Sequence, residues 1–169
     1  MAAMTRALML IMFTMFLSSC GVYGFRGNNP PEGIRKIFVP QFEDASGFSD
    51  PTLPEQFTQD LKIRITNDNT FRIADKTAAD ASLVCTILTV VDDALVIVSG
   101  ETVTRRKVTI TIAADFQDLK KQKSIWKRNF VNYGEYVSSS NDFSERAQGV
   151  SIALNRICED ILIDLTSNW

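Results

Sequence analysis

The chain has 169 residues, of which 45% are hydrophobic and 22% charged, and its formal net charge is −2. This composition is ordinary for a globular domain, and it gives no reason to expect a nucleic-acid partner. Histidine is absent, which excludes Ser-His-Asp and Cys-His catalytic sites and any zinc site that contains histidine.

Residues 1–19 have the pattern of a secretory signal peptide. One basic residue, Arg6, precedes an apolar run that ends at residue 17, and the run is shorter than the roughly 20 residues that span a bilayer. Residues 17–20 read Leu-Ser-Ser-Cys, the form of a bacterial lipobox. We therefore predict cleavage before Cys20 and lipidation of its thiol by diacylglycerol, with further acylation such as palmitate anchoring the chain. The alternative is an ordinary signal peptide that ends near a cysteine.

Cleavage leaves a mature chain of 150 residues, which is enough for one domain with its own core. Residues 20–33 are rich in Gly, Asn and Pro, so we expect a lipidated tether there and a single domain over 34–169. No second apolar segment of spanning length follows in the sequence. The lipid is therefore the expected anchor, and the domain is expected in an aqueous compartment outside the inner membrane.

The first half of the domain predicts a strand, a helix and a second short strand. Alternation over 34–42 places Ile37 and Val39 on one face of a strand, and a polar loop is expected over 43–50. Thr52 and Glu55 then have the spacing of a capping box, and residues 67–69 end the helix. An apolar residue recurs every four positions between them: Leu53, Phe57, Leu61 and Ile65. A short strand follows over 71–74.

The second half predicts a three-stranded meander and a long helix. Strands are expected over 81–98, 103–116 and 124–137, with turns at 99–101 and 118–122. In the first of these strands, Leu83, Cys85, Ile87 and Val91 are expected on one face, with Val84, Leu88 and Val90 on the other. In the second, the apolar face is Val108, Ile110, Ile112, Ala114 and Phe116. Apolar residues then recur at helical spacing over 143–165, after an N-cap candidate at Asp142.

This order of elements predicts an α+β fold. We expect a two-layer sandwich, in which two helices cover one face of a mostly antiparallel sheet of four to five strands. The second face of such a sheet is normally polar. The segments 81–98 and 124–137 nevertheless carry apolar or aromatic residues on both faces. Either a partner protein covers the second face, or the alternation is uneven at the strand ends.

Positive charge is concentrated over residues 100–128, which contain eight basic and three acidic residues. The rest of the mature chain has a net charge of −8. This asymmetry suggests contact with an anionic partner in one place. Arg105, Arg106 and Lys107 begin a strand that is about 45 Å long, and the other basic residues lie at its far end, so one anionic group cannot touch both clusters. We favour the far-end turn as a ligand-facing or membrane-distal tip: Lys120, Lys121 and Lys123, with Lys127 and Arg128 close behind. A solvated hairpin without a ligand is the alternative.

The remaining cysteines and the adjacent acidic residues do not form a recognisable catalytic or metal-binding motif. Cys85 and Cys158 could form a disulfide in an oxidising compartment or could be buried free thiols, and the second interpretation is favoured. The adjacent carboxylates at 92–93 and 159–160 point in different directions on a strand or helix. No nucleophile elbow, phosphate-binding glycine loop, metal motif or cofactor motif is present, so we predict a protein that is not an enzyme.

The start of the mature chain resembles a known family. After the cysteine come a segment rich in Gly and Pro and then a strand that ends in Pro-x-Phe. One departure from the family pattern is Val22, which separates Gly21 from Tyr23, whereas this Gly and Tyr are adjacent in many members. These features resemble the LptE family of lipopolysaccharide-assembly lipoproteins of Gram-negative outer membranes. The residues that carry the resemblance are Cys20, Gly21, Tyr23, Phe25, Gly27, Pro31, Gly33, Ile37, Val39, Pro40 and Phe42.

The resemblance implies a lipid-anchored protein at the periplasmic face of the outer membrane, inside the lumen of the LptD β-barrel, where it supports lipopolysaccharide insertion into the outer leaflet. Lipopolysaccharide is anionic, so the basic turn becomes its candidate binding site. An outer-membrane lipoprotein that activates a cell-wall synthase is the alternative, because such proteins also begin with a strand ending in Pro-x-Phe. The short tether, at most about 45 Å long when extended, argues against that alternative.

Overall fold

The computed structural model describes residues 30–96, 105–138 and 142–167. The predicted signal peptide, Cys20 and the turn expected at 99–101 lie outside these residues. The elements, in chain order, are β1 (Lys36–Phe38), β2 (Glu43–Asp44), α2 (Leu53–Asp68), β3 (Arg72–Ile73), β4 (Ala81–Val96), β5 (Arg105–Asp118), β6 (Lys123–Val137) and α3 (Asp142–Ser167). The short β2 lies within the segment that the sequence predicted as a polar loop.

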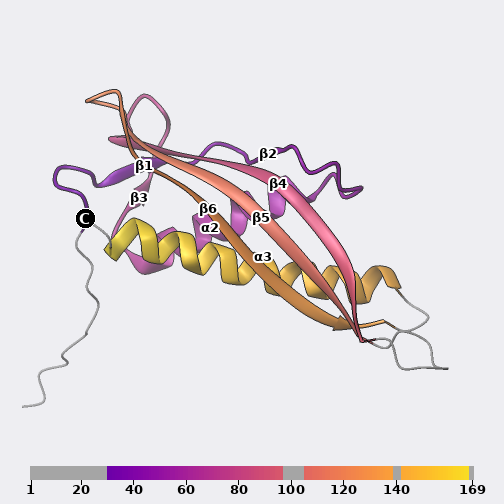
Figure 1. Ribbon diagram of the computed structural model, residues 1–169. Coiled ribbons are helices and arrows are strands. Elements are labelled where there is room, and N and C mark those ends of the chain that lie inside the picture. The colour runs from indigo at the N-terminus through magenta and orange to yellow at the C-terminus, as the bar shows by residue number, and fades with distance from the viewer. Residues whose placement is uncertain (1–29, 97–104, 139–141, 168–169) are drawn as a thin grey trace, which may run out of the picture.

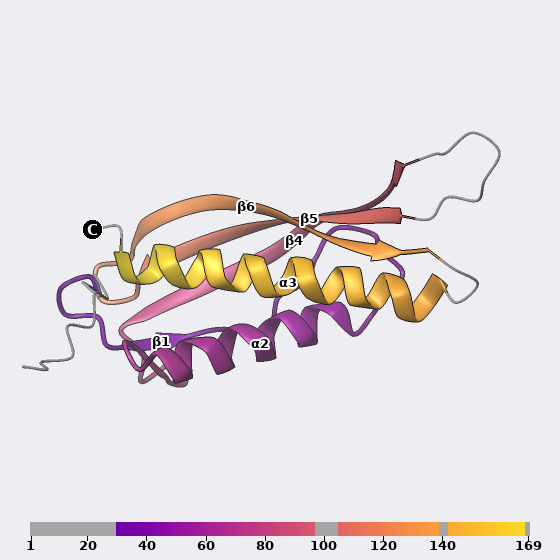
Figure 2. The ribbon, with the colours of Figure 1, turned by 90° about the horizontal axis from the view of Figure 1, so that it is seen from below.

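The elements form an α+β sandwich, as predicted. The sheet has six strands in the order β3-β1-β4-β5-β6, with β2 also pairing with β4. β4, β5 and β6 form the long antiparallel meander, whereas β1, β2 and β3 add short parallel pairings. Both helices lie side by side on one face of the sheet (Figures 1 and 2). The other face is open.

Helix α2 buries the stripe that its four-residue period predicted. Leu53, Phe57, Leu61 and Ile65 are all fully buried, and Asn69 ends the helix in the left-handed conformation with φ 61°. The predicted capping box does not form. The Thr52 hydroxyl instead donates to Asp50 at 2.7 Å and makes no capping hydrogen bond.

Helix α3 supplies the other half of the core. Leu154, Ile157 and Ile161 are buried in the same cluster as Ile110 and Ile112 of β5. Cys85 and Cys158 belong to this cluster as free thiols. Burial raises the pKa of the Cys158 thiol to about 12. Within the part of the chain that the structure describes, no helix is long and apolar enough to cross a membrane.

The prediction for the faces of β4 was wrong beyond Ile87. A bulge between Ile87 and Thr89 shifts the register against β5, and an extra residue in one strand reverses which side chains face the core. Val90 therefore packs against the core, while Val91 lies on the open face with 45% of its surface exposed. On β5 the predicted apolar face is confirmed, because alternate residues from Val108 to Phe116 are buried.

Candidate functional site

The basic turn between β5 and β6 is organised by the carboxylate of Asp118. Asp118 Oδ1 accepts the backbone N–H groups of Lys120 at 2.9 Å and Lys121 at 2.8 Å. The hydrogen bond from the Lys121 N–H is the main cause that lowers the pKa of Asp118, and burial opposes it. Gln122 completes the turn with φ 50°. The geometry leaves the lysine side chains on the outside, so the turn presents positive charge on a fixed backbone.

The turn lies at the end of the sheet where the described part of the chain begins (Figure 1). Lys121 and Lys123 line a hollow of about 370 Å³ together with Pro31, Glu32 and Ile34. The turn therefore packs beside the first described residues of the domain. A sequence cannot indicate which end of a long hairpin meets the N-terminal segment, since that contact is tertiary.

Most of the five candidate cations have an acidic partner. Lys120 Nζ lies 2.6 Å from Asp80, Lys121 Nζ 3.6 Å from Asp118, Lys127 Nζ 2.8 Å from Asp115 and Arg128 Nη1 2.5 Å from Asp164. Among the described residues, Lys123 has no ion-pair partner. Two of these partners, Asp80 and Asp164, lie outside residues 100–128 and so reduce the excess of positive charge that the local count gave.

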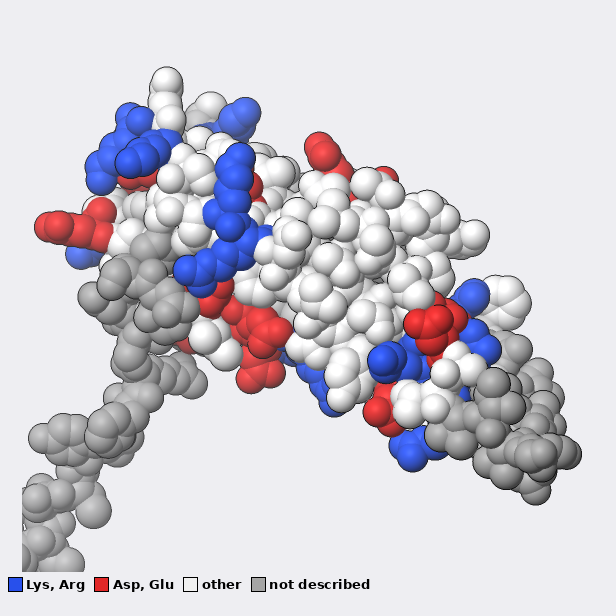
Figure 3. All heavy atoms as spheres, in the orientation of Figure 1, with Lys and Arg blue, Asp and Glu red and all other residues white. Residues whose placement is uncertain are grey.

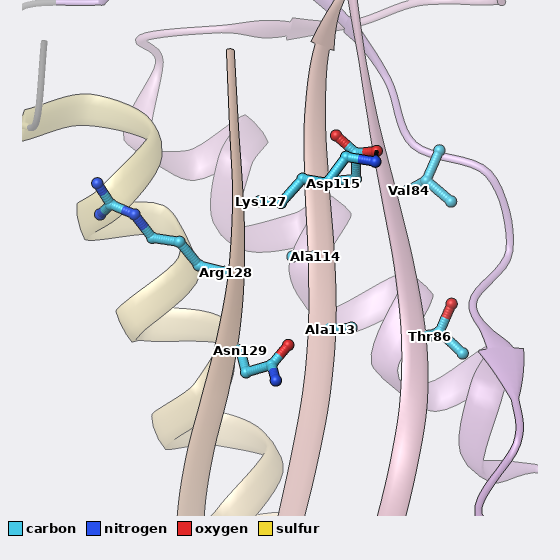
Figure 4. Close-up of a pocket in the computed structure, with 8 residues that line it drawn as sticks. All are labelled: Val84, Thr86, Ala113, Ala114, Asp115, Lys127, Arg128 and Asn129. Atoms are coloured by element: carbon cyan, nitrogen blue, oxygen red, sulfur yellow. Dashed lines mark ion pairs between the residues drawn. The ribbon is translucent and has the colours of Figure 1, made fainter. Parts of the chain in front are cut away.

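Lys127 and Arg128 do not join the turn in a single site. Successive residues of a strand point to opposite faces, so Lys127 reaches across the open face toward Asp115 while Arg128 points toward α3 (Figure 4). Lys127 borders a second hollow, of about 570 Å³, above the small side chain of Ala113. Its lining is completed by Val84, Thr86, Ala114, Arg128 and Asn129, so its charged residues are Lys127, Arg128 and Asp115.

The pair between Lys127 and Asp115 is embedded in further hydrogen bonds. Asp115 accepts from Gln117 at 2.7 Å and from the Ser124 hydroxyl at 2.8 Å. Burial acts to raise the pKa of Asp115, but the hydrogen bonds from Lys127, Gln117 and Ser124 together lower it. Lys127 thus faces a carboxylate that three hydrogen-bonding groups hold in place, while its own side chain is 68% exposed.

The lysines of the turn remain accessible to an anion. The side chains of Lys120 and Lys121 are 69% and 75% exposed, and ion pairs at such exposed sites contribute only about 0–1 kcal/mol. An incoming phosphate can therefore exchange with the carboxylate partners at low cost. The structure brings Lys120, Lys121 and Lys123 together at this turn.

The second basic cluster, at the opposite end of β5, is divided between the two faces of the sheet. Arg105 pairs with Glu135 at 3.1 Å on the open face. Arg106 points inward, where its Nε donates to Asp92 and to the Tyr136 hydroxyl, both at 3.0 Å. Figure 3, which views the open face, shows basic side chains toward both ends of the sheet and a broad area between them that carries no charge.

Sequence reasoning missed an aromatic contact near this second cluster. Lys107 Nζ lies 5.4 Å from the centre of the Tyr133 ring, and the Arg156 guanidinium from α3 lies 5.2 Å from the same ring. Tyr133 lies in the segment 124–137, for which the sequence predicted only a strand with apolar or aromatic residues on both faces. No local signal could have found the contact, because the three residues come from three elements. No group of acidic or cysteine side chains within the described residues could hold a metal ion.

Comparison with known proteins identifies a family. A family model described as LptE, lipopolysaccharide-assembly, matches residues 34–168. No functionally curated protein matches the sequence.

Solved structures with the same fold have low sequence identity. The hypothetical protein CT253 from Chlamydia trachomatis has a TM-score of 0.61 at 9% identity, over 78% of this chain and 95% of that one. Protein XCC0632 from Xanthomonas campestris has a TM-score of 0.56 at 14% identity, over 79% and 87% of the two chains. A minor lipoprotein from Acinetobacter baumannii has a TM-score of 0.51 at 11% identity, over 78% and 90%. At such identities these structures indicate a shared fold alone.

Proposed function

Since the chain belongs to the LptE lipopolysaccharide-assembly family, we propose that it is a lipid-anchored protein of the outer membrane that sits inside an LptD β-barrel. There it supports the barrel while lipopolysaccharide passes to the outer leaflet. The observation that carries this proposal is the match of the family model to residues 34–168. The family is one of assembly proteins rather than of enzymes, and the lack of histidine agrees with a role without catalysis.

The open face of the sheet supports a large protein partner. Val91, Val131, Tyr133 and Val137 are between 42% and 60% exposed on this side of the meander, and threonines occupy much of the surface between them. An exposed surface on which apolar and hydroxyl side chains predominate, with the charged residues gathered toward its ends, is typical of a surface that a partner covers. We assign this face to the barrel wall.

The basic turn supports contact with lipopolysaccharide. Lys120, Lys121 and Lys123 would bind its phosphate or acidic sugar groups mainly through charge, since an ammonium group is a compact cation without a fixed hydrogen-bonding plane. Lys127 and Arg128 would add to the positive potential around the turn, since they lie behind it along β6 and point to opposite faces of the sheet.

The test is affinity purification of the full-length tagged chain from mildly solubilised membranes, followed by mass spectrometry of what co-purifies. A large outer-membrane barrel protein should remain bound after salt washing, because an extensive apolar interface does not depend on exposed charges. The intact mass of the purified chain should show a protein that begins at acylated Cys20. Recovery of a cell-wall synthase in place of a barrel would contradict the proposal and support the alternative role.

A further inference from the structure

β4 has neighbouring strands on both sides over its first part, but beyond Ile87 it is paired on one side only among the described residues. β1 pairs with Ala81 and Ser82, and β2 pairs with Thr86 and Ile87. The N–H of Ala45 then donates to the Ile87 carbonyl at 2.9 Å. Beyond that bond, no strand pairing or backbone hydrogen bond from the described residues reaches β4 on this side. The backbone edge from Thr89 to Ala94 is therefore open.

This open segment is a regular piece of strand. It lies between two register shifts, one after Ile87 and one after Ala94. Within it, every residue from Thr89 to Ala94 is in register with a residue of β5, from Thr111 back to Arg106. Six regular residues equal a typical strand in length. The segment is thus ready to accept one more strand without rearrangement.

The outer edge of the sheet at β6 is protected, in contrast. Arg156 donates to the Tyr133 carbonyl at 2.7 Å, and the Asn132 side chain accepts the Tyr133 N–H at 3.0 Å. Exposed Lys127 and Arg128 also lie along this strand. Charged and polar side chains of this kind discourage pairing at an edge. The open segment of β4 contains no lysine, arginine or proline.

The charges of the open segment select against a second copy of this chain. Antiparallel pairing of two such segments in the register centred on Asp92 would place the two Asp92 side chains directly opposite one another, and like charges in that position are destabilising. Asp92 is compensated by Arg106 at 3.0 Å. Among the described residues Asp93 has no ion pair, since Lys107, its register partner on β5, lies against Tyr133 instead.

We propose that the edge of β4 from Thr89 to Ala94 is the docking site for an extended segment of the partner protein, which adds a strand to the sheet and places a lysine or arginine opposite Asp93. The partner's backbone would satisfy the open N–H and C=O groups, as in other cases of strand addition. Val91 provides an exposed apolar contact beside this edge. The inference rests on the proposed function, in which the partner is an outer-membrane barrel protein.

Hydrogen exchange and two variants test this docking site in the full-length, membrane-extracted protein. In the co-purified complex, the edge-facing amides of residues 89–94 should exchange at least about tenfold more slowly than in the chain without its partner. Val91→Lys and Asp93→Lys, which place a cation on the edge, should each lower recovery of the barrel protein about tenfold. The matched control is Ile63→Lys, which adds the same charge at a 55% exposed site on α2 and should leave recovery unchanged.

The possible results distinguish failure of the β4 docking site from failure of the proposed function. Normal recovery of the barrel with both edge variants, or unchanged exchange of these amides in the complex, overturns the docking site and leaves the proposed function standing. A wild-type chain that recovers no barrel overturns both. Denaturation midpoints of the two variants should equal that of the wild type, and the hydrogen-exchange result stands without any substitution.

Discussion

Asp80 illustrates how single side chains hold this fold together. Its Oδ2 accepts the backbone N–H groups of Arg35 and Lys36, both at 3.0 Å, and its Oδ1 lies 2.6 Å from Lys120 Nζ. One carboxylate thus joins the start of β1, the start of β4 and the basic turn. The hydrogen bond with Lys120 first, and then those from Arg35 and Lys36, lower the pKa of Asp80 to about 2.

This pKa predicts how stability depends on pH. A carboxylate whose pKa is lower in the folded state stabilises the fold above its unfolded pKa, and the contribution disappears as the pH falls through the folded value. After allowance for solvent screening of the exposed Lys120 partner, Asp80 should contribute about 1 kcal/mol at pH 7, and this should be lost between about pH 4 and pH 2. Urea denaturation of Asp80→Asn at pH 7 and pH 2.5 measures it. An equal difference from wild type at both pH values would contradict the assignment.

At the scale of elements, α3 crosses β6 at a contact between two glycines. A Cβ atom on Gly134 would lie 1.9 Å from the Gly149 carbonyl oxygen and 2.9 Å from Ile152 Cβ. The first neighbour is backbone and cannot rotate away. The glycines are therefore required by the close approach of helix and strand, which the helical and strand periodicities of the sequence do not reveal.

We predict that Gly134→Ala lowers the free energy of unfolding by about 3 kcal/mol, the upper part of the range for overpacking. Gly149→Ala should cost less, because its Cβ would meet the Tyr136 ring at 2.8 Å, and a side chain can shift. Asn129→Ala, on the exposed face of the same strand, is the control and should change stability little. Urea midpoints that rank Gly149→Ala as the more damaging of the two would contradict this view of the crossing.

At the scale of the whole molecule, the two basic clusters lie at opposite ends of the hairpin, so their roles can be separated. The turn variant Lys120→Ser, Lys121→Ser and Lys123→Ser should weaken lipopolysaccharide binding about tenfold, since each lost contact contributes up to about 1 kcal/mol. The fold should persist because Asp80 keeps its two backbone hydrogen bonds. Binding assays at low and high salt should also show a weaker salt dependence for the variant.

The control for the turn variant is Arg105→Ser with Lys107→Ser at the other end of β5. Arg106 is left in place, because its removal would leave Asp92 without its ion-pair partner inside the fold. This control should bind lipopolysaccharide as the wild type does. Loss of binding in the control but not in the turn variant would move the ligand site to the opposite end of the sheet.

Sequence patterns alone were sufficient for the elements and for the layer arrangement. The four-residue stripe of α2, the alternation of β5 and the continuous helical period of α3 each predict a buried face, because burial of one face is what gives a helix or strand its periodicity. The order of those elements then leaves few ways to cover an antiparallel sheet. The resemblance at the mature N-terminus also led to the family that the domain match identifies.

Only the tertiary structure decided what the basic residues do. Asp80 and Asp164, which lie outside the basic segment, pair with Lys120 and Arg128. The bulge at Ile87 reversed the faces of β4, and the short β1 and β2 strands left part of its edge open. These features depend on contacts between residues distant along the chain, and a local pattern carries no information about which distant groups will meet.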